Sequence, residues 1–113
     1  MKCAIVGSRE LRIDNISEYI PTGADEIISG GARGVDTVAS EYARKQGIKL
    51  TEFLPNYKKY GRRAPLVRNL QIIEQSDCVI ALWDGHSPGT KYVIEECRKR
   101  GVEVHVFLIN KEE

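Results

Sequence analysis

The fold of this chain is decided by residues 27–43, which read IISGGARGVDTVASEYA. The stretch opens with apolar, β-prone residues, and three glycines then follow within five positions. After the last glycine, apolar residues recur with the spacing of one α-helix face, at Val35, Val38, Ala39, Tyr42 and Ala43. The stretch therefore predicts a strand, a glycine turn and a helix.

The turn between this strand and this helix is suited to an anion. Free backbone N–H groups at a helix start point toward one spot, which the helix dipole makes favourable for negative charge. Gly30, Gly31 and Gly34 would let a ligand approach the backbone closely, and Arg33 would add a fork of donors for phosphate or carboxylate. The glycine spacing matches neither G-x-G-x-x-G nor the Walker loop. A tight turn that needs glycine only for its geometry is therefore the alternative.

Strand and helix patterns alternate along the rest of the chain. Strands are predicted at residues 2–7, 26–29, 48–54, 78–83 and 102–109. Helices are predicted from Val35 to near Gly47, over residues 64–76 with Leu66, Leu70 and Ile73 on the apolar face, and from the turn at 84–90 to Gly101. This order predicts the α/β class. We expect residues 1–113 to form a single Rossmann-like domain, with a five-stranded, mostly parallel sheet and helices on both faces.

Composition narrows the possible functions. The 113 residues fit one domain, and a net charge of +1 gives no general attraction to nucleic acid. No apolar run has the length of a membrane span, so we expect a cytoplasmic protein without a membrane partner. A homodimer is compatible with a small open α/β domain, although no apolar stripe identifies a face. Three cysteines without short spacing predict buried thiols rather than disulfides or zinc ligands, and we expect neither a metal nor a cofactor.

Three segments that follow predicted strands should share one edge of the sheet, namely residues 7–9, 30–34 and 84–90. Ligands of parallel sheets bind at this edge, where the strand order reverses. Asp36 could cap its helix or contact a ribose, and Asp84 could bind a ribose hydroxyl or support its loop. Pro88 marks an early helical position whose N–H groups could hold a second phosphate. The candidate ligand-binding residues are Gly7, Ser8, Arg9, Gly30, Gly31, Arg33, Gly34, Asp36, Arg68, Asn69, Asp84, Gly89 and Thr90.

Residues 56–63, NYKKYGRR, form the one strongly biased segment, which we expect to be a loop. Tyrosines among basic residues suit stacking and backbone contacts on single-stranded nucleic acid. They equally suit a lid that closes on a base or phosphate, or a solvated surface loop.

Several motifs together resemble a known superfamily. Residues 29–43, SGGARGVDTVASEYA, resemble the glycine-arginine run of the DNA-processing protein A family. VGSR at 6–9, the RN pair at 68–69, DCVIALWDG at 77–85 and SPGTKYVIEE at 87–96 resemble the YspA-like branch of the SLOG superfamily, which includes the Lonely Guy phosphoribohydrolases. The resemblance implies a Rossmann-like domain with a pocket for a nucleotide or a nucleotide-derived ligand of the ADP-ribose type. The matching positions are Gly7, Ser8, Arg9, Gly30, Gly31, Arg33, Gly34, Arg68, Asn69, Gly89 and Thr90.

The chain departs from the phosphoribohydrolases at their catalytic motif, P-G-G-x-G-T-x-x-E. It keeps only Pro88-Gly89-Thr90, and Val93 stands where the catalytic glutamate falls. Breaking an N-glycosidic bond calls for a carboxyl group at the reacting centre. Our leading hypothesis is therefore binding of a nucleotide-derived ligand. The alternatives are a nucleoside 5'-monophosphate phosphoribohydrolase that uses Glu95 or Asp36, and single-stranded nucleic-acid binding through residues 56–63.

Overall fold

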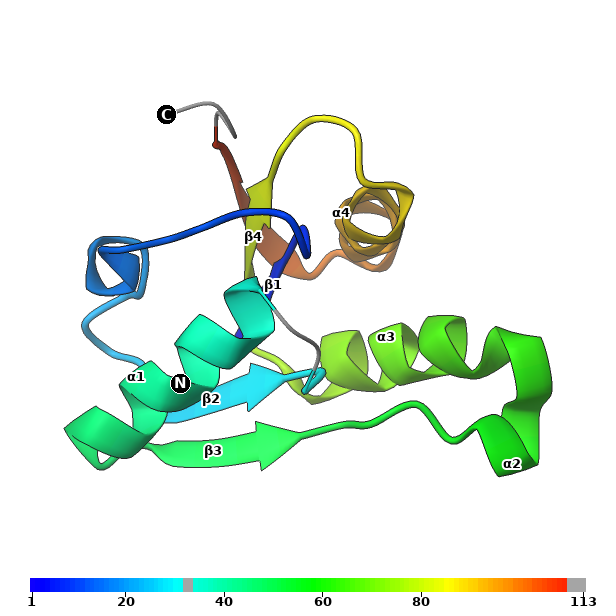
Figure 1. The fold of residues 1–113 in the computed structure, drawn as a ribbon, viewed down its shortest axis with the longest axis horizontal. Helices are drawn as coiled ribbons and strands as arrows, with labels where there is room; N and C mark the ends of the chain where they lie inside the picture. Colours follow the sequence, from blue (N-terminus) through cyan, green and yellow to red (C-terminus); the bar gives the residue numbers. More distant parts are fainter. Residues whose placement is uncertain (32–33, 110–113) are drawn as a thin grey trace.

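Five parallel strands form one sheet in the order β3-β2-β1-β4-β5 in a computed structural model, which describes residues 1–31 and 34–109 (Figure 1). The strands are β1 (Lys2–Gly7), β2 (Glu26–Ser29), β3 (Lys49–Glu52), β4 (Cys78–Trp83) and β5 (Glu103–Leu108). Every pairing in the sheet is parallel. The predicted α/β class and five-stranded sheet are confirmed.

In the described part of the chain, four α-helices and two short 3₁₀ segments connect the strands: η1 (Ile16–Glu18), α1 (Val35–Gln46), α2 (Tyr57–Tyr60), η2 (Gly61–Arg63), α3 (Ala64–Gln75) and α4 (Pro88–Arg100). Two helix ends follow directly from sequence. α1 and α4 end at Gly47 and Gly101, both in the left-handed conformation, after basic residues in the last turn.

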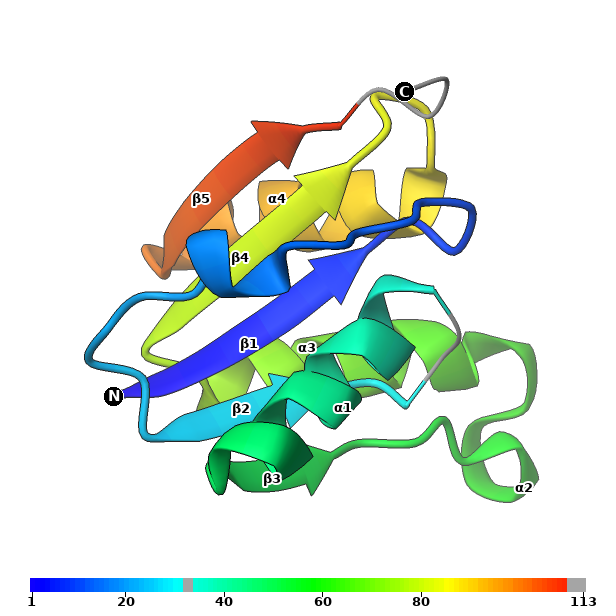
Figure 2. The ribbon, with the colours of Figure 1, turned by 60° about the vertical axis from the view of Figure 1, so that its left-hand side comes forward.

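The two faces of the sheet carry separate apolar layers (Figure 2). α1 and η1 cover one face, where Ile5, Ile27 and Ile80 are buried. α3 and α4 cover the other face, where Ile28 and Val79 are buried. Because both faces are covered, β1 and β4 are apolar along almost their whole length.

The strand order reverses between β1 and β4. From β1 the chain moves outward to β2 and β3, and then returns through α3 to β4 on the other side of β1. The carboxyl ends of β1 and β4 lie side by side, with Gly7 paired to Leu82. This junction is the position at which open parallel sheets bind ligands.

Residues 56–63 differ from the sequence prediction, since they form α2 and η2 rather than an irregular loop. The side chain of Asn56 caps α2 by accepting a hydrogen bond from the Lys59 N–H (3.1 Å). A helix of one turn is too short for an apolar period to reveal it. In Figure 1 it lies at the far end of α3, away from the sheet.

The buried face of α3 was predicted only in part, since Ile73 is buried as predicted but Leu66 is not. Leu66 is 43% exposed, whereas Arg68 is 9% exposed. Ala64, Ile72 and Ile73 supply the rest of the buried face. Apolar spacing placed Leu66 toward the core because it takes no account of a cavity beside the first turns of the helix.

The remaining predictions concern cysteines and membrane spans. Cys3, Cys78 and Cys97 are free and buried, as predicted. Within residues 1–31 and 34–109, every helix is too short or too polar to cross a bilayer.

Candidate ligand-binding site

A cavity of about 410 Å³ lies at the carboxyl edge of the sheet, beside the junction of β1 and β4. Its walls come from the end of β1 and the residues after it, the end of β2, and the first turns of α1, α3 and α4. The volume falls within the range of small-molecule sites, about 300–1,000 Å³.

Most of the candidate residues meet in this cavity. Those in its lining are Gly7, Ser8, Arg9, Gly30, Asp36, Arg68, Asn69, Gly89 and Thr90. Gly31, Gly34 and Asp84 do not line it, and Arg33 lies outside the described residues. The three segments read separately from the sequence therefore converge, with Gly30 representing the turn after β2 and Ser87–Thr90 representing the segment after β4.

Gly7 and Gly34 bring the start of α1 against the end of β1. A Cβ on Gly7 would lie 2.6 Å from Cγ2 of Val35 and 2.7 Å from the carbonyl oxygen of Leu82. A Cβ on Gly34 would lie 2.6 Å from the carbonyl oxygen of Arg9, and Gly34 has a φ of 79°. Both positions leave no room for a Cβ, at Gly7 because of the Val35 side chain and the Leu82 carbonyl, and at Gly34 because of the Arg9 backbone.

Gly30 makes room for the guanidinium of Arg68. A Cβ on Gly30 would lie 2.6 Å from Nη1 of Arg68 and 3.1 Å from Oδ2 of Asp36. Nη1 of Arg68 donates a hydrogen bond to the carbonyl oxygen of Gly30 (2.8 Å), and Nε donates to Oδ1 of Asn69 (2.9 Å). These bonds hold the guanidinium at the cavity wall, although Arg68 comes from a helix whose packing face would ordinarily be apolar.

The cavity is electrostatically asymmetric. Burial lowers the pKa of Arg68, the nearby carboxylate of Asp36 opposes this shift, and the positive charge of Arg9 adds to it. An arginine stays protonated in proteins despite such effects. Two arginines therefore line one cavity and repel each other, and Asp36 adds a buried carboxylate to the same lining.

Ser8 and Asp84 organise the loop that leads to α4. The backbone N–H of Ser8 donates to the carbonyl oxygen of Leu82 (3.2 Å), and its Oγ accepts from the backbone N–H of Asp84 (3.3 Å). The Asp84 carboxylate accepts hydrogen bonds from the backbone N–H groups of His86 and Ser87 (both 2.8 Å) and from the Ser87 hydroxyl. Burial favours the neutral form, but these hydrogen bonds prevail and hold the pKa of Asp84 at about 2.

The start of α4 is the most open part of the wall. Ser87 occupies the N-cap position but makes no side-chain cap, and Pro88 is the first helical residue. A Cβ on Gly89 would meet nothing within 4 Å. Thr90 is 6% exposed, and its hydroxyl has no hydrogen-bond partner among the described residues. The first-turn N–H groups of α4 lack intrahelical acceptors.

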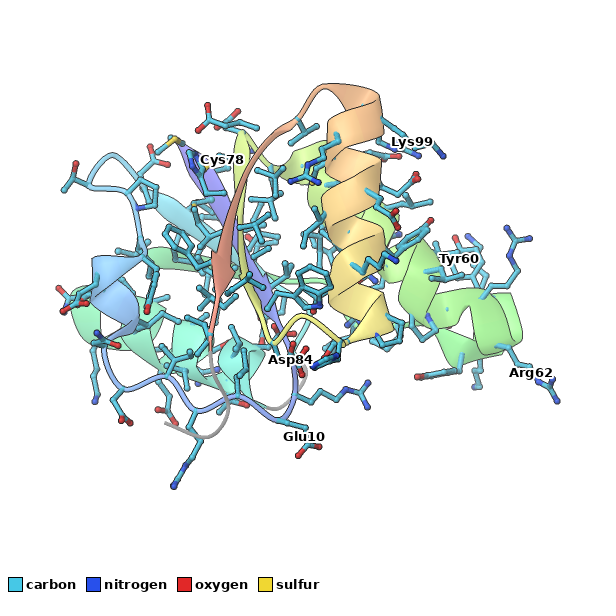
Figure 3. All side chains as sticks on the ribbon, turned by 90° about the horizontal axis from the view of Figure 1, so that it is seen from above. Glu10, Tyr60, Arg62, Cys78, Asp84 and Lys99 are labelled. Carbon is cyan, nitrogen blue, oxygen red and sulfur yellow. The ribbon has the colours of Figure 1, made fainter. Side chains whose placement is uncertain are left out.

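Figure 3 shows this end of the molecule, with Asp84 next to the first turn of α4, Glu10 near it, and Lys99 at the opposite end of the helix. Glu10 also lines the cavity, although its side chain is exposed.

Sequence reasoning missed the apolar wall of the cavity, which consists of Val6, Pro65, Leu66, Ile72 and Val93. One usable signal was the spacing of Leu66, Asn69 and Ile72, which share one side of α3. Val93 lines the cavity and is 2% exposed, so an apolar residue occupies the position of the phosphoribohydrolase glutamate. Glu95 and Glu96 are not in the lining, and Glu96 pairs with Lys99 and Arg100.

Comparison with known proteins agrees with the expected relationship. The profile of the YAcAr family, described as the YspA, cpYpsA-related SLOG family, matches residues 9–60. Gene 61 protein of Mycobacterium phage D29 is 31% identical over 87 residues, which cover 72% of this chain and 70% of that protein. The chain belongs to this SLOG family. Membership in the SLOG family points to a nucleotide-related ligand. No solved structure matches the chain.

Proposed function

We propose that this SLOG domain binds a nucleotide-derived ligand, of the nucleoside-phosphate or ADP-ribose type, in the 410 Å³ cavity. The observation that carries the proposal is the pair of arginines on one cavity. Arg68 is almost buried and fixed by Gly30 and Asn69, while Arg9 adds a second positive charge.

Phosphate is the chemical group whose charge and hydrogen-bond acceptors best complement these two arginines. Two like charges near one cavity raise each other's energy, and an anion between them removes that cost. A guanidinium has five N–H donors in a planar fork that fits phosphate. The first turn of α4 adds backbone N–H groups and the positive end of a helix dipole on the same cavity.

The rest of the lining suits a nucleoside. Pro65, Leu66 and Val93 provide an apolar surface for a base. Asp36 and Thr90 provide a carboxylate and a hydroxyl that are suited to ribose hydroxyl groups.

Calorimetry with AMP, ADP-ribose, NAD and cyclic nucleotides tests the proposal. At least one should bind, and Arg9→Ala should weaken its binding about tenfold through loss of a charged contact. Arg12→Ala is the matched control, because Arg12 is exposed and does not line the cavity. The proposal fails if none of these ligands binds at millimolar concentration, or if the two variants behave alike.

A second candidate function, nucleoside-monophosphate hydrolysis, is favoured by one observation: Asp36 is a buried carboxylate that lines the cavity. Val93 argues against hydrolysis, because it places an apolar side chain at the position of the catalytic glutamate in the phosphoribohydrolases. Chromatography of AMP incubated with the protein distinguishes the two functions. Binding alone leaves AMP intact, whereas base release that Asp36→Asn abolishes would establish hydrolysis.

A further inference from the structure

A second cavity, of about 220 Å³, lies between α2 and the first turns of α3. Its lining includes Asn56, Lys59, Tyr60, Arg68 and Gln71. Arg68 also lines the 410 Å³ cavity, so one buried arginine contributes to the walls of both spaces. The two cavities lie along different sides of α3, since Pro65, Asn69 and Ile72 line the first, and Ala64, Val67 and Gln71 line the second.

The two cavities differ in the charged residues that line them. Lys59 and Arg68 are both in its lining, and no carboxylate among the described residues is. Lys58, Arg62 and Arg63 add positive charge along the same exposed segment, in which residues 56–63 contain no acidic residue. The lining of the first cavity, in contrast, contains two carboxylates, Asp36 and Glu10, beside its two arginines.

Lys59 is held in place although its side chain is exposed. Asn56 fixes its backbone by capping α2, with the Lys59 N–H 3.1 Å from Oδ1. The Lys59 ammonium lies 5.3 Å from the centre of the Tyr60 ring, within the range of a cation–π contact. A one-turn helix gains little stability of its own, yet here it presents a lysine and a tyrosine to one cavity.

We propose that the second cavity is a subsite for a second phosphate-bearing unit of the ligand, so that the ligand class is a dinucleotide. This inference rests on the proposed function of the first cavity. One nucleotide unit occupies the first cavity, the linking phosphate passes Arg68, and the second unit contacts Lys59 through phosphate. Asn56, Tyr60 and Gln71 supply hydrogen-bonding groups for its sugar or base.

A mononucleotide would leave this cavity empty, which makes the inference testable with two probes. The probes are AMP and the 5'-phosphorylated diadenylate pApA, titrated by calorimetry at low and high salt. We expect pApA to bind at least about tenfold more tightly than AMP, because it alone can reach both cavities.

Lys59→Gln should weaken pApA binding about fivefold, as expected for an exposed charge pair, and should leave AMP binding unchanged. The Lys59→Gln effect should shrink at high salt. Lys58→Gln is the matched control, since Lys58 lies on the same helix but does not line the cavity. Thermal unfolding of both variants should match that of the unmodified protein.

Two results would overturn the subsite: equal affinity for AMP and pApA, or pApA affinity indifferent to Lys59→Gln. Either result alongside intact AMP binding, still sensitive to Arg9→Ala, would leave the function of the first cavity standing. Failure of both probes to bind would overturn the subsite, whereas the function of the first cavity would fall only if ADP-ribose, NAD and cyclic nucleotides also failed to bind.

Discussion

The turn after β2 and the start of α4 both contribute glycine to the same cavity, yet the two regions use it differently. In the turn, Gly30 makes room for Arg68 and Gly34 makes room for the backbone of Arg9. At the start of α4, Gly89 faces open space and has no neighbour within 4 Å of a possible Cβ. The glycines of the turn allow close packing within the protein, whereas Gly89 leaves space in the cavity that a ligand can occupy.

This difference predicts which substitutions damage the fold and which damage only binding. A change in the turn must move backbone or displace a buried guanidinium. A change at Gly89 alters the chemistry of the cavity wall without disturbing any internal contact.

The largest effect is expected at Gly34. Gly34→Ala should reduce the free energy of unfolding by about 3 kcal/mol, because the backbone conformation disfavours a side chain and the new Cβ would collide with the Arg9 carbonyl. Urea unfolding measures the loss.

Gly47→Ala is the control for this substitution, since Gly47 also has a positive φ, of 68°, but has nothing within 4 Å of a possible Cβ. Its cost should be about 1 kcal/mol. Equal losses for the two variants would show that the close approach to Arg9 contributes nothing.

Gly89→Asp should separate binding from stability. The new carboxylate would repel a bound phosphate and weaken nucleotide binding by at least about tenfold. In the first turn of α4 the same charge complements the helix dipole and should raise the free energy of unfolding by about 0.5 kcal/mol.

Calorimetry and urea unfolding of the same preparation check both effects of Gly89→Asp. Gly89→Asn adds similar bulk without charge and should affect binding less. Loss of stability in Gly89→Asp would contradict the open environment assigned to this glycine.

The smallest effect concerns pH and Asp84, which holds the loop before α4. Its folded-state pKa of about 2 lies below the ordinary value of 3.8, so its ionised form stabilises the fold. That contribution is fully present above pH 3.8 and is lost as the pH falls through about 2.

Asp84→Asn tests the predicted direction of this pH dependence. Thermal unfolding should show the variant less stable than the unmodified protein at neutral pH, with the gap closing between pH 3.8 and about 2. A gap that stays constant across this interval would mean that the carboxylate charge is unimportant to the loop.

Local chemistry made much of the fold predictable. β1, β2 and β4 follow apolar runs, and their bounds agree with the predicted strands at 2–7, 26–29 and 78–83. α1 and α4 each end at a glycine with φ near 70°, which follows basic residues in the last turn. In each case the signal lies within a few residues of the feature, so it can be recognised without any long-range contact.

The cavity was predictable only in outline. The carboxyl-edge rule for parallel sheets brought residues 7–9, 30–34 and 84–90 together without coordinates. It could not separate Gly30, which lines the cavity, from Gly34, which packs against Arg9 behind it. Nor could it reveal α2, whose single turn is too short to show a period.

By itself, the sequence determined the α/β alternation, the edge of the sheet that carries the cavity, and the family of the chain, because each depends on neighbouring residues or on position along a strand. Only the tertiary structure decided that Arg68 is buried and bonded to Gly30, 38 positions away in the chain. That contact depends on how α3 packs over the sheet, which brings distant residues to within one hydrogen bond and leaves no local trace in the sequence.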